Sequence, residues 1–441
     1  MPFMPFDILG IWLRGLLSIA ILAGAVTLLR SWREHSYTWV PDRPAVAEAR
    51  PGAPDRADPA PENRADPAAT GREPARAVAA GDGPGRWEWS FRPGMNRETA
   101  ELAGALALLA WALAGRPIAK SLAKIWLKPG DDEPDTGRGG DIRRLRRPDG
   151  TELHVEIYGP PDAPPIVMTH GWGANATEWY YEKKRLAGRF RLIVWDLPGL
   201  GLSKPPDDGD FSLEKLARDL DAVLELAGGR PAVLLGHSIG GMITLTYCRL
   251  FPEALASRVA GLVLVHTTYT NPVRTTQMAG IKSALEKPVL VPVLHLTIAL
   301  WPLVWLMNWL NYLRGSFHQS THRSAFAGTE TRGQLDFAAQ FLPHDRPDVL
   351  ARGMFGMLAY DATATLGTIT VPTLIVAADR DITTLPEASE FINRGIPGST
   401  LVVLAPARHM GLVERHDRFD EVVGEFAGTC LGSAAREAPV A

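Results

Sequence analysis

The chain has little cysteine and no excess of positive charge. Its 441 residues include only Cys248 and Cys430, which cannot build a disulfide framework or a cysteine-based metal motif. The formal net charge is −3, so the chain lacks the basic excess of a nucleic-acid-binding protein. The 46% of hydrophobic residues is enough for one large α/β domain with further segments.

A serine stands at the centre of a glycine-rich turn. The apolar run 232–235 leads into Gly236-His237-Ser238-Ile239-Gly240, and a helix-like stretch follows over 242–250. In a sharp strand-to-helix turn the central hydroxyl is exposed, and Gly236 and Gly240 carry no side chains that would collide across it. The pattern also occurs in ordinary turns. Ser238 is therefore a candidate nucleophile only if partners for it exist elsewhere.

Such partners follow two later apolar runs. A serine hydroxyl needs a base and a group that orients the base. His409 comes shortly after the run 401–404 and is the candidate base. The run 373–376 leads to Asp379 and Asp381, either of which could orient His409, and we favour Asp381.

The order Ser238, Asp381, His409 resembles that of the α/β-hydrolase superfamily, in particular its serine esterases and lipases with a helical cap. The acid loop of that family runs Gly-x-x-Asp. Here Ala378 takes the glycine position and Asp381 the aspartate position. The resemblance covers residues from about 151 to about 428.

The same resemblance implies an oxyanion hole. His170-Gly171 follows the apolar run 165–169 and matches the family's His-Gly motif. By analogy, the backbone N–H groups of Trp172 and Ile239 would face the developing negative charge. The loop 196–203 matches a second family motif, Asp-x-x-Gly-x-Gly-x-Ser, and we expect it to be structural.

The resemblance also implies the fold. We expect an α/β-hydrolase domain over residues 140–430, with a mostly parallel central sheet and helices on both faces, and a helical cap at about 268–360. His237 is expected to be a packed or hydrogen-bonded side chain rather than a second base. His318 and His322 have the spacing of metal ligands on a helix, but no carboxylate or cysteine cluster accompanies them, so we expect no metal site.

Two N-terminal segments are predicted before that domain. Residues 1–35 are expected to form a transmembrane anchor, since 8–29 is apolar apart from Arg14, whose side chain must snorkel or lie near the interface. A membrane anchor is favoured over a cleaved signal peptide, because no clear small-x-small cleavage site precedes residues 28–30. Residues 36–98 are rich in Pro, Ala, Arg and Asp and predict a disordered linker.

A second membrane-associated helix region is predicted over 99–130. Its apolar stretch 102–115 is short, so it could cross the bilayer, lie against it or pack on the hydrolase. Lys120, Lys124 and Lys128 could then meet anionic headgroups or form a solvated face. If both apolar stretches span, the hydrolase domain lies on the side of the N-terminus, and the lysines favour the cytoplasmic side of a bacterial cell membrane.

The cap contains an unusually apolar segment. Residues 288–313 include no Asp, Glu, Lys or Arg, and Trp301, Trp305 and Trp309 recur every four residues. A straight span here would separate the acid and base loops from the serine, and Pro302 limits the regular helix. The segment either packs over the core as an ordinary cap helix or, as we favour, lines an acyl pocket and touches the bilayer.

These patterns together predict a membrane-tethered serine hydrolase that cleaves apolar carboxylic or lipid esters through an acyl-enzyme on Ser238. The expected partners are a small-molecule or lipid ester and membrane lipids, with no nucleic acid and no metal or organic cofactor. An acyltransferase with the same triad remains open, as does a non-catalytic membrane-anchored scaffold.

Overall fold

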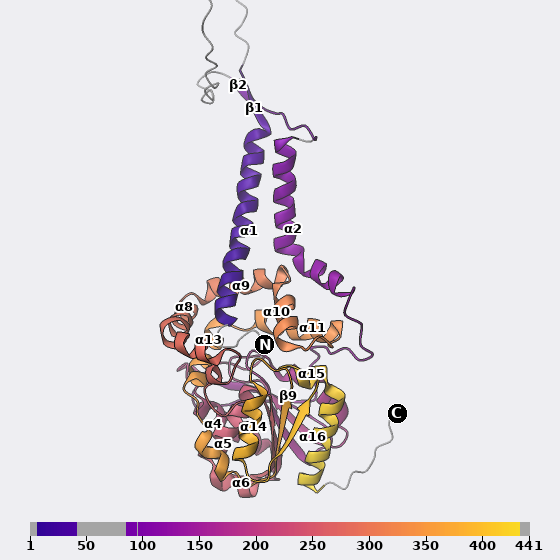
Figure 1. Ribbon diagram of the computed structural model, residues 1–441, viewed down its shortest axis with the longest axis vertical. Helices are drawn as coiled ribbons and strands as arrows, with labels where there is room; N and C mark the ends of the chain where they lie inside the picture. Colours follow the sequence, from indigo (N-terminus) through magenta and orange to yellow (C-terminus); the bar gives the residue numbers. More distant parts are fainter. Residues whose placement is uncertain (1–6, 42–84, 95, 433–441) are drawn as a thin grey trace, which may run out of the picture. The chain divides into compact units, whose positions relative to one another are not determined.

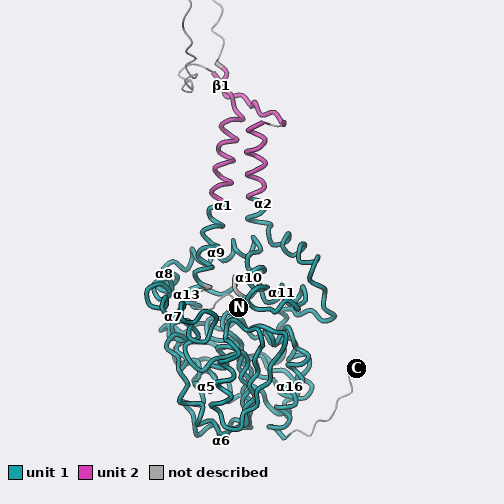
Figure 2. The backbone as a smooth tube through the Cα atoms, viewed as in Figure 1, with its two compact units in different colours: residues 1–21, 109–441 teal, residues 22–108 magenta. Residues whose placement is uncertain are grey.

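The computed structural model describes residues 7–41, 85–94 and 96–432 of the chain. These residues fall into two compact units, shown in Figure 2. The larger unit joins residues 1–21 to residues 109–441, and the smaller one holds residues 22–108.

An eight-stranded sheet forms the centre of the larger unit (Figure 1). Its inner parallel strands are buried runs rich in Val, Ile and Leu, as is typical of sheets covered on both faces. In spatial order they are β10 (Thr400–Leu404), β9 (Thr373–Ala378), β8 (Val259–Val265), β7 (Ala232–His237), β5 (Pro165–Thr169), β6 (Arg191–Trp195), β4 (Glu152–Tyr158) and β3 (Asp141–Arg146). The pairs β3–β4 and β4–β6 are antiparallel and the others are parallel.

Helices cover both faces of this sheet. Val167 packs into one core with α4 (Leu213–Leu224), α5 (Ile239–Leu250) and α14 (Pro386–Gly395), whereas its neighbours Ile166 and Met168 pack into a second core with α3 (Tyr180–Leu186) and α16 (His416–Leu431). This alternation follows from the two-residue period of a strand. The short helices α6 (Pro252–Arg258) and α15 (Gly411–Glu414) complete the layers. The predicted fold class is confirmed.

Helices inserted between β8 and β9 form the cap. They are α7 (Ala279–Leu285), α8 (Val291–Ala299), α9 (Trp301–Leu313), α10 (Ser316–Ala325), α11 (Arg332–Ala339), α12 (Phe341–His344) and α13 (Pro347–Leu358). A π-helical turn (Glu286–Leu290) joins α7 to α8. The chain bends by 97° between the segment ending at Ala299 and α9, so the apolar segment 288–313 is not one straight helix.

Helix α1 (Asp7–His35) begins inside the larger unit. Ile8 and Ile11 are buried in the same core as residues of the cap. The Trp12 indole N–H donates to Thr297 Oγ1 at 3.0 Å, and the Ser18 hydroxyl donates to Asn311 Oδ1 at 3.2 Å. The start of the predicted anchor is therefore packed against α8 and α9.

The smaller unit contains the rest of α1, the start of α2 (Arg97–Ala123) and a two-stranded antiparallel sheet of β1 (Tyr37–Pro41) and β2 (Gly85–Trp89). The strands lie within residues 36–98, for which we expected a disordered linker, so that expectation is wrong at both ends. Cross-strand aromatic pairs such as Tyr37–Trp89, with ring centroids 5.1 Å apart, hold the strands together. Residues 42–84 of the expected linker lie outside the described residues.

A buried ionic cluster joins strand β4 to the residue that follows β6. Arg138 Nη1 lies 2.6 Å from Glu156 Oε1 and 3.0 Å from Asp196 Oδ2, and both carboxylates are fully buried. Burial alone would raise the pKa of Glu156, but hydrogen bonds from His154 and Tyr158, the charge of Lys183 and the hydrogen bond from Arg138 outweigh it and lower the pKa to about 2. Glu156 therefore stays charged, and Arg138 bridges the two buried carboxylates.

We predict that Arg138→Met lowers the free energy of unfolding by about 3–5 kcal/mol, because buried Asp196 loses its paired cation and buried Glu156 loses one of its two. Urea unfolding in mild detergent, followed by tryptophan fluorescence, measures this. The matched control is Arg144→Met, which removes a half-exposed arginine 3.4 Å from Glu152 and should cost below about 1 kcal/mol. Equal losses in the two variants would contradict the assignment.

Candidate active site

Ser238 occupies a strained turn between β7 and α5. Its φ of 54° and ψ of −115° lie outside the usual regions for a side chain of L configuration. The flanking glycines make this turn sterically feasible. A Cβ on Gly236 would lie 2.3 Å from the carbonyl carbon of Gly240, and a Cβ on Gly240 would lie 2.2 Å from the carbonyl oxygen of Thr169. Glycine is required at both positions.

The structure brings Ser238, His409 and Asp381 together in a hydrogen-bonded row. His409 Nε2 lies 3.0 Å from Ser238 Oγ, and His409 Nδ1 lies 2.8 Å from Asp381 Oδ2. A carboxylate only accepts, so Nδ1 carries the proton and Nε2 faces the hydroxyl with its lone pair. His409 and Asp381 are buried, whereas Ser238 is partly exposed.

The alternative acid, Asp379, has a different position. Its Oδ1 accepts a hydrogen bond from the backbone N–H of Ala407 at 2.8 Å, which supports the loop that carries His409. Asp381 instead accepts from the N–H of Thr383 at 2.8 Å and from the hydroxyl of Thr384 at 3.0 Å, in addition to its bond with the imidazole. The geometry thus favours Asp381 as the partner of His409.

Burial and charge act in opposite directions on the pKa values of this row. Burial alone would raise the pKa of Asp381, but the positive charge and hydrogen bond of His409 outweigh it and the pKa is lowered. For His409, burial lowers the pKa, and the nearby Asp381 only partly offsets the effect. At neutral pH the imidazole is therefore neutral and able to accept a proton.

The His-Gly loop after β5 is fixed by its own hydrogen bonds. His170 Nε2 accepts from the backbone N–H of Leu197 at 2.9 Å, so the proton is on Nδ1, which donates to the Gly171 carbonyl at 2.8 Å. The Trp172 indole N–H donates to the carbonyl of Leu350 in α13 at 3.1 Å. Trp172 thus lies in the loop after β5, and its side chain contacts the cap helix α13. Ile239 is the first residue of α5 and directly follows the serine.

Two residues that the sequence analysis missed support this site. Glu178 Oε1 lies 3.1 Å from His237 Nδ1, and His237 Nε2 lies 3.1 Å from the backbone carbonyl of His409. The same carbonyl accepts from His266 Nδ1 at 3.0 Å. Burial lowers the pKa of His266 to about 3, so its ring is neutral. The only sequence signal for His266 was its place at the end of an apolar run, and Glu178 had none.

The loop 196–203 is structural, as expected from its motif. Asp196 accepts hydrogen bonds from the backbone N–H of Ala176 at 2.7 Å and of Leu202 at 2.8 Å. The hydroxyl of Ser203 donates to the Asp196 carbonyl at 2.6 Å. Each of these contacts closes the loop on itself or onto its neighbour, and none involves Ser238.

The cap histidines pair with acids rather than with each other. His318 Nε2 lies 2.9 Å from Asp336 Oδ1, and His322 Nδ1 contacts Glu330. In the described part of the chain, no group of three or more His, Cys, Asp or Glu side chains is arranged to hold a metal ion.

Comparisons with known proteins identify similar hydrolases and esterases. Residues 164–285 match the alpha/beta hydrolase fold family. A pimeloyl-[acyl-carrier protein] methyl ester esterase of Aeromonas hydrophila is 26% identical over 284 residues, which cover 63% of this chain and 99% of the relative. The solved structure of an esterase from Exiguobacterium antarcticum is similar with a TM-score of 0.53 and 25% identity, covering 66% of this chain and 99% of that one.

Proposed function

This chain belongs to the α/β-hydrolase fold superfamily and is an esterase-like hydrolase, and from that premise we propose that it cleaves carboxylic esters through an acyl-enzyme on Ser238. The observation that carries the proposal is the hydrogen-bonded row of Ser238, His409 and Asp381. A serine oxygen 3.0 Å from a neutral imidazole nitrogen is in position to lose its proton as it attacks.

In the proposed reaction, Ser238 Oγ attacks the ester carbonyl while His409 Nε2 takes the hydroxyl proton. Asp381 holds the imidazole in the required tautomer and stabilises the imidazolium. The protonated His409 then donates its proton to the leaving alkoxide, which departs as an alcohol. A water molecule, deprotonated by His409, attacks the acyl-enzyme and releases the carboxylic acid and the free serine.

The negative charge on the attacked carbonyl oxygen would be stabilised by the backbone N–H groups of Trp172 and Ile239. Both groups belong to turns at the carboxyl ends of neighbouring parallel strands, β5 and β7. Loss of one such donor typically costs about 3–4 kcal/mol of transition-state stabilisation. The hydrogen bond from the Trp172 indole to α13 would fix the position of the Trp172 backbone N–H. The indole and α13 together would limit the space for the acyl or alcohol group.

We propose an apolar carboxylic or lipid ester as the substrate. The support is the exposed apolar surface of α8 and α9, where Leu296, Leu303, Trp305 and Leu306 are each about 40–50% exposed. The Aeromonas hydrophila relative is named for a methyl ester of an acyl group, and the Exiguobacterium antarcticum relative for ester hydrolysis. An exposed apolar surface on the cap would favour substrates that partition into lipid.

We further propose that the protein is held in a membrane by α1 and α2. The helical segments Ile8–His35 and Arg97–Ala123 are both long and apolar enough to span a bilayer, with mean hydropathies of 1.9 and 1.6. Because the start of α1 packs on α8 and α9, its insertion would bring the exposed apolar side chains of the cap to the interface. Two spans would leave the hydrolase on the side of the N-terminus, and the lysines after α2 favour the cytoplasm.

We predict that a fluorophosphonate probe labels the detergent-solubilised protein and that Ser238→Ala abolishes both labelling and ester turnover, because the alcohol nucleophile is lost. The matched control is Ser203→Ala, which removes a buried hydroxyl that lies in the structural loop and should keep labelling. Circular dichroism checks that both variants fold. Failure of the wild-type protein to react would leave the non-catalytic scaffold as the better explanation.

The substrate class is tested by hydrolysis rates over p-nitrophenyl esters of increasing acyl length. We expect kcat/KM to rise from acetate to medium-length chains, since each buried methylene contributes about 0.8 kcal/mol of transfer free energy. A maximum at acetate would contradict the apolar-substrate proposal without affecting the role of Ser238.

Product analysis with an added acceptor alcohol separates hydrolysis from acyl transfer. An ester product in place of acid would identify an acyltransferase.

The pH dependence follows from the lowered pKa of His409. Turnover needs the neutral imidazole, so activity is present above this pKa and is lost as the pH falls through it. We predict that the acid limb of kcat/KM has its midpoint below the ordinary imidazole value of about 6.5. A p-nitrophenyl ester followed at its isosbestic wavelength measures this. A midpoint at or above the ordinary value would contradict the effect of burial on His409.

The two-span arrangement predicts opposite accessibility for the linker and the C-terminus. In a Cys430→Ser background, a membrane-impermeant maleimide should label Thr70→Cys in intact cells, but should label Ser433→Cys only after lysis. The remaining Cys248 is buried and provides the background measurement. Labelling of both positions from the same side would mean that α2, which lies between them in the chain, does not cross the membrane.

A further inference from the structure

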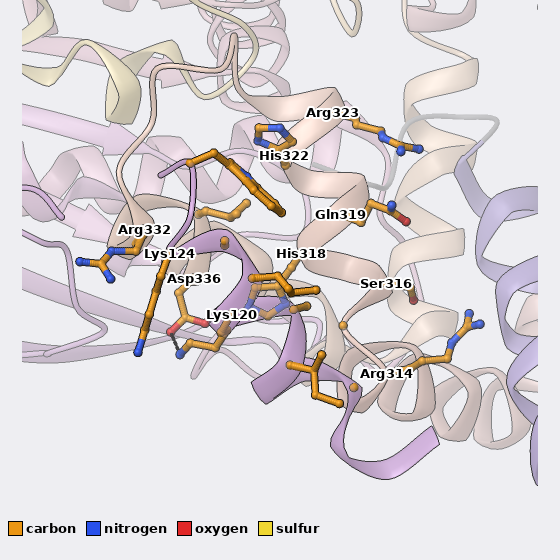
Figure 3. A pocket seen from close by; sticks show the side chains of 18 of the residues that line it. Lys120, Lys124, Arg314, Ser316, His318, Gln319, His322, Arg323, Arg332 and Asp336 are labelled. Atoms are coloured by element: carbon orange, nitrogen blue, oxygen red, sulfur yellow. Dashed lines mark hydrogen bonds and ion pairs between the residues drawn. The ribbon is translucent and has the colours of Figure 1, made fainter. Parts of the chain in front are cut away.

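A large cavity lies beside the end of α2, apart from the serine (Figure 3). Its volume is about 1040 Å³, at the upper end of the range for small-molecule sites. The walls come from α2 and the turn after it, from α10 and from α11. Ser238, His409 and Trp172 are not among the lining residues. The cavity is therefore separate from the site of the proposed reaction.

One wall of this cavity is apolar and exposed. Trp111, Ile118, Leu122 and Trp126 line it, and each is about half exposed or more, with Trp126 at 61%. These side chains recur along α2 and the turn that follows it. Large apolar side chains gathered along one wall of a cavity mark a binding surface for apolar groups.

The rest of the lining carries an excess of positive charge. Six cationic side chains face two carboxylates, Glu133 and Asp336. The cationic residues are Arg14, Lys120, Lys124, Arg314, Arg323 and Arg332. Asp336 is already shared by Arg116, Lys120 and His318. Within residues 96–432, no carboxylate lies within ion-pair distance of Lys124, Arg323 or Arg332.

Arg314 adds a buried cation to this lining. It is 8% exposed, and in the described part of the chain its Nε has no hydrogen-bond partner. Its guanidinium lies 5.7 Å from the ring centroid of Trp111, and one of its nitrogens donates to the backbone carbonyl of Arg14 at 3.3 Å. Burial and the charge of Arg14 lower the pKa of Arg314. Arg314 therefore adds to the positive charge of the lining beside Trp111, at a place apart from Lys124 and Arg332.

We propose that this cavity binds an anionic phospholipid, with an acyl chain along the apolar wall of α2 and the phosphate held at the rim by Lys124 and Arg332. Figure 3 shows these two side chains on the same side of α10, with Arg314 and Arg323 on the other side. A phospholipid fits because it combines a long apolar chain with a fixed negative charge, and because the wall belongs to a helix suited to a bilayer. A free fatty acid offers related chemistry with a carboxylate, and the experiment below separates the two.

The test measures lipid binding to the full-length Ser238→Ala protein, which prevents turnover of the probe. Native mass spectrometry in mild detergent gives the affinities for palmitoyl-oleoyl phosphatidylglycerol, for the neutral phosphatidylcholine with the same chains, and for oleate. We expect phosphatidylglycerol to bind at least fivefold tighter than the other two. The double variant Lys124→Gln with Arg332→Gln loses both positive charges and should bind phosphatidylglycerol roughly tenfold more weakly or worse.

The matched control is Lys204→Gln with Arg218→Gln, which removes the same charges from exposed positions outside the cavity and should leave the affinity unchanged. Melting temperatures check that both double variants fold. Equal affinities for phosphatidylglycerol and phosphatidylcholine, or equal losses in the two double variants, would overturn the proposal. Binding of oleate as tight as that of phosphatidylglycerol would overturn it in favour of a fatty-acid site.

Discussion

The hydrogen bond between His409 and Ser238 depends on backbone positions set by five neighbouring strands. The serine follows β7 in a conformation that only the adjacent glycines permit. The imidazole follows β10, and its backbone carbonyl is held by His237 and by His266, which follows β8. Asp381 follows β9, and the His-Gly loop follows β5. A parallel sheet places all these carboxyl ends at one edge, which is why Ser238 and His409 meet there although they are 171 positions apart.

The sheet and the order of the polar residues at its edge could be predicted, because buried parallel strands are continuous apolar runs and their ends are local in sequence. The contacts behind that edge could not be predicted from the sequence. Glu178 lies in a short helical turn with no recognisable motif, and its partner His237 is 59 residues away. Its role depends on how a loop folds back beneath the serine turn, and a single sequence holds no signal for such a contact.

The N-terminal region shows a second limit of the sequence pattern. An apolar helix face is compatible with lipid and with protein, so composition predicted an anchor but not that Ile8 and Ile11 would join the core below the cap. The linker composition likewise concealed β1 and β2, since two short strands with aromatic pairs occupy only its margins. In both cases the sequence identified the kind of surface, and tertiary contacts decided what covers it.

These contacts connect the proposed anchor to the proposed oxyanion loop. Trp12 in α1 bonds to Thr297 in α8, His295 in α8 packs against Phe355 in α13 with ring centroids 4.9 Å apart, and α13 accepts the hydrogen bond of Trp172. Each contact joins side chains packed closely enough that none moves far without displacing its neighbour. The first turns of α1 are therefore a structural part of the hydrolase body. Removing them would expose the parts of α8 and α9 that they contact, so a soluble truncated protein would not be an equivalent of the full chain.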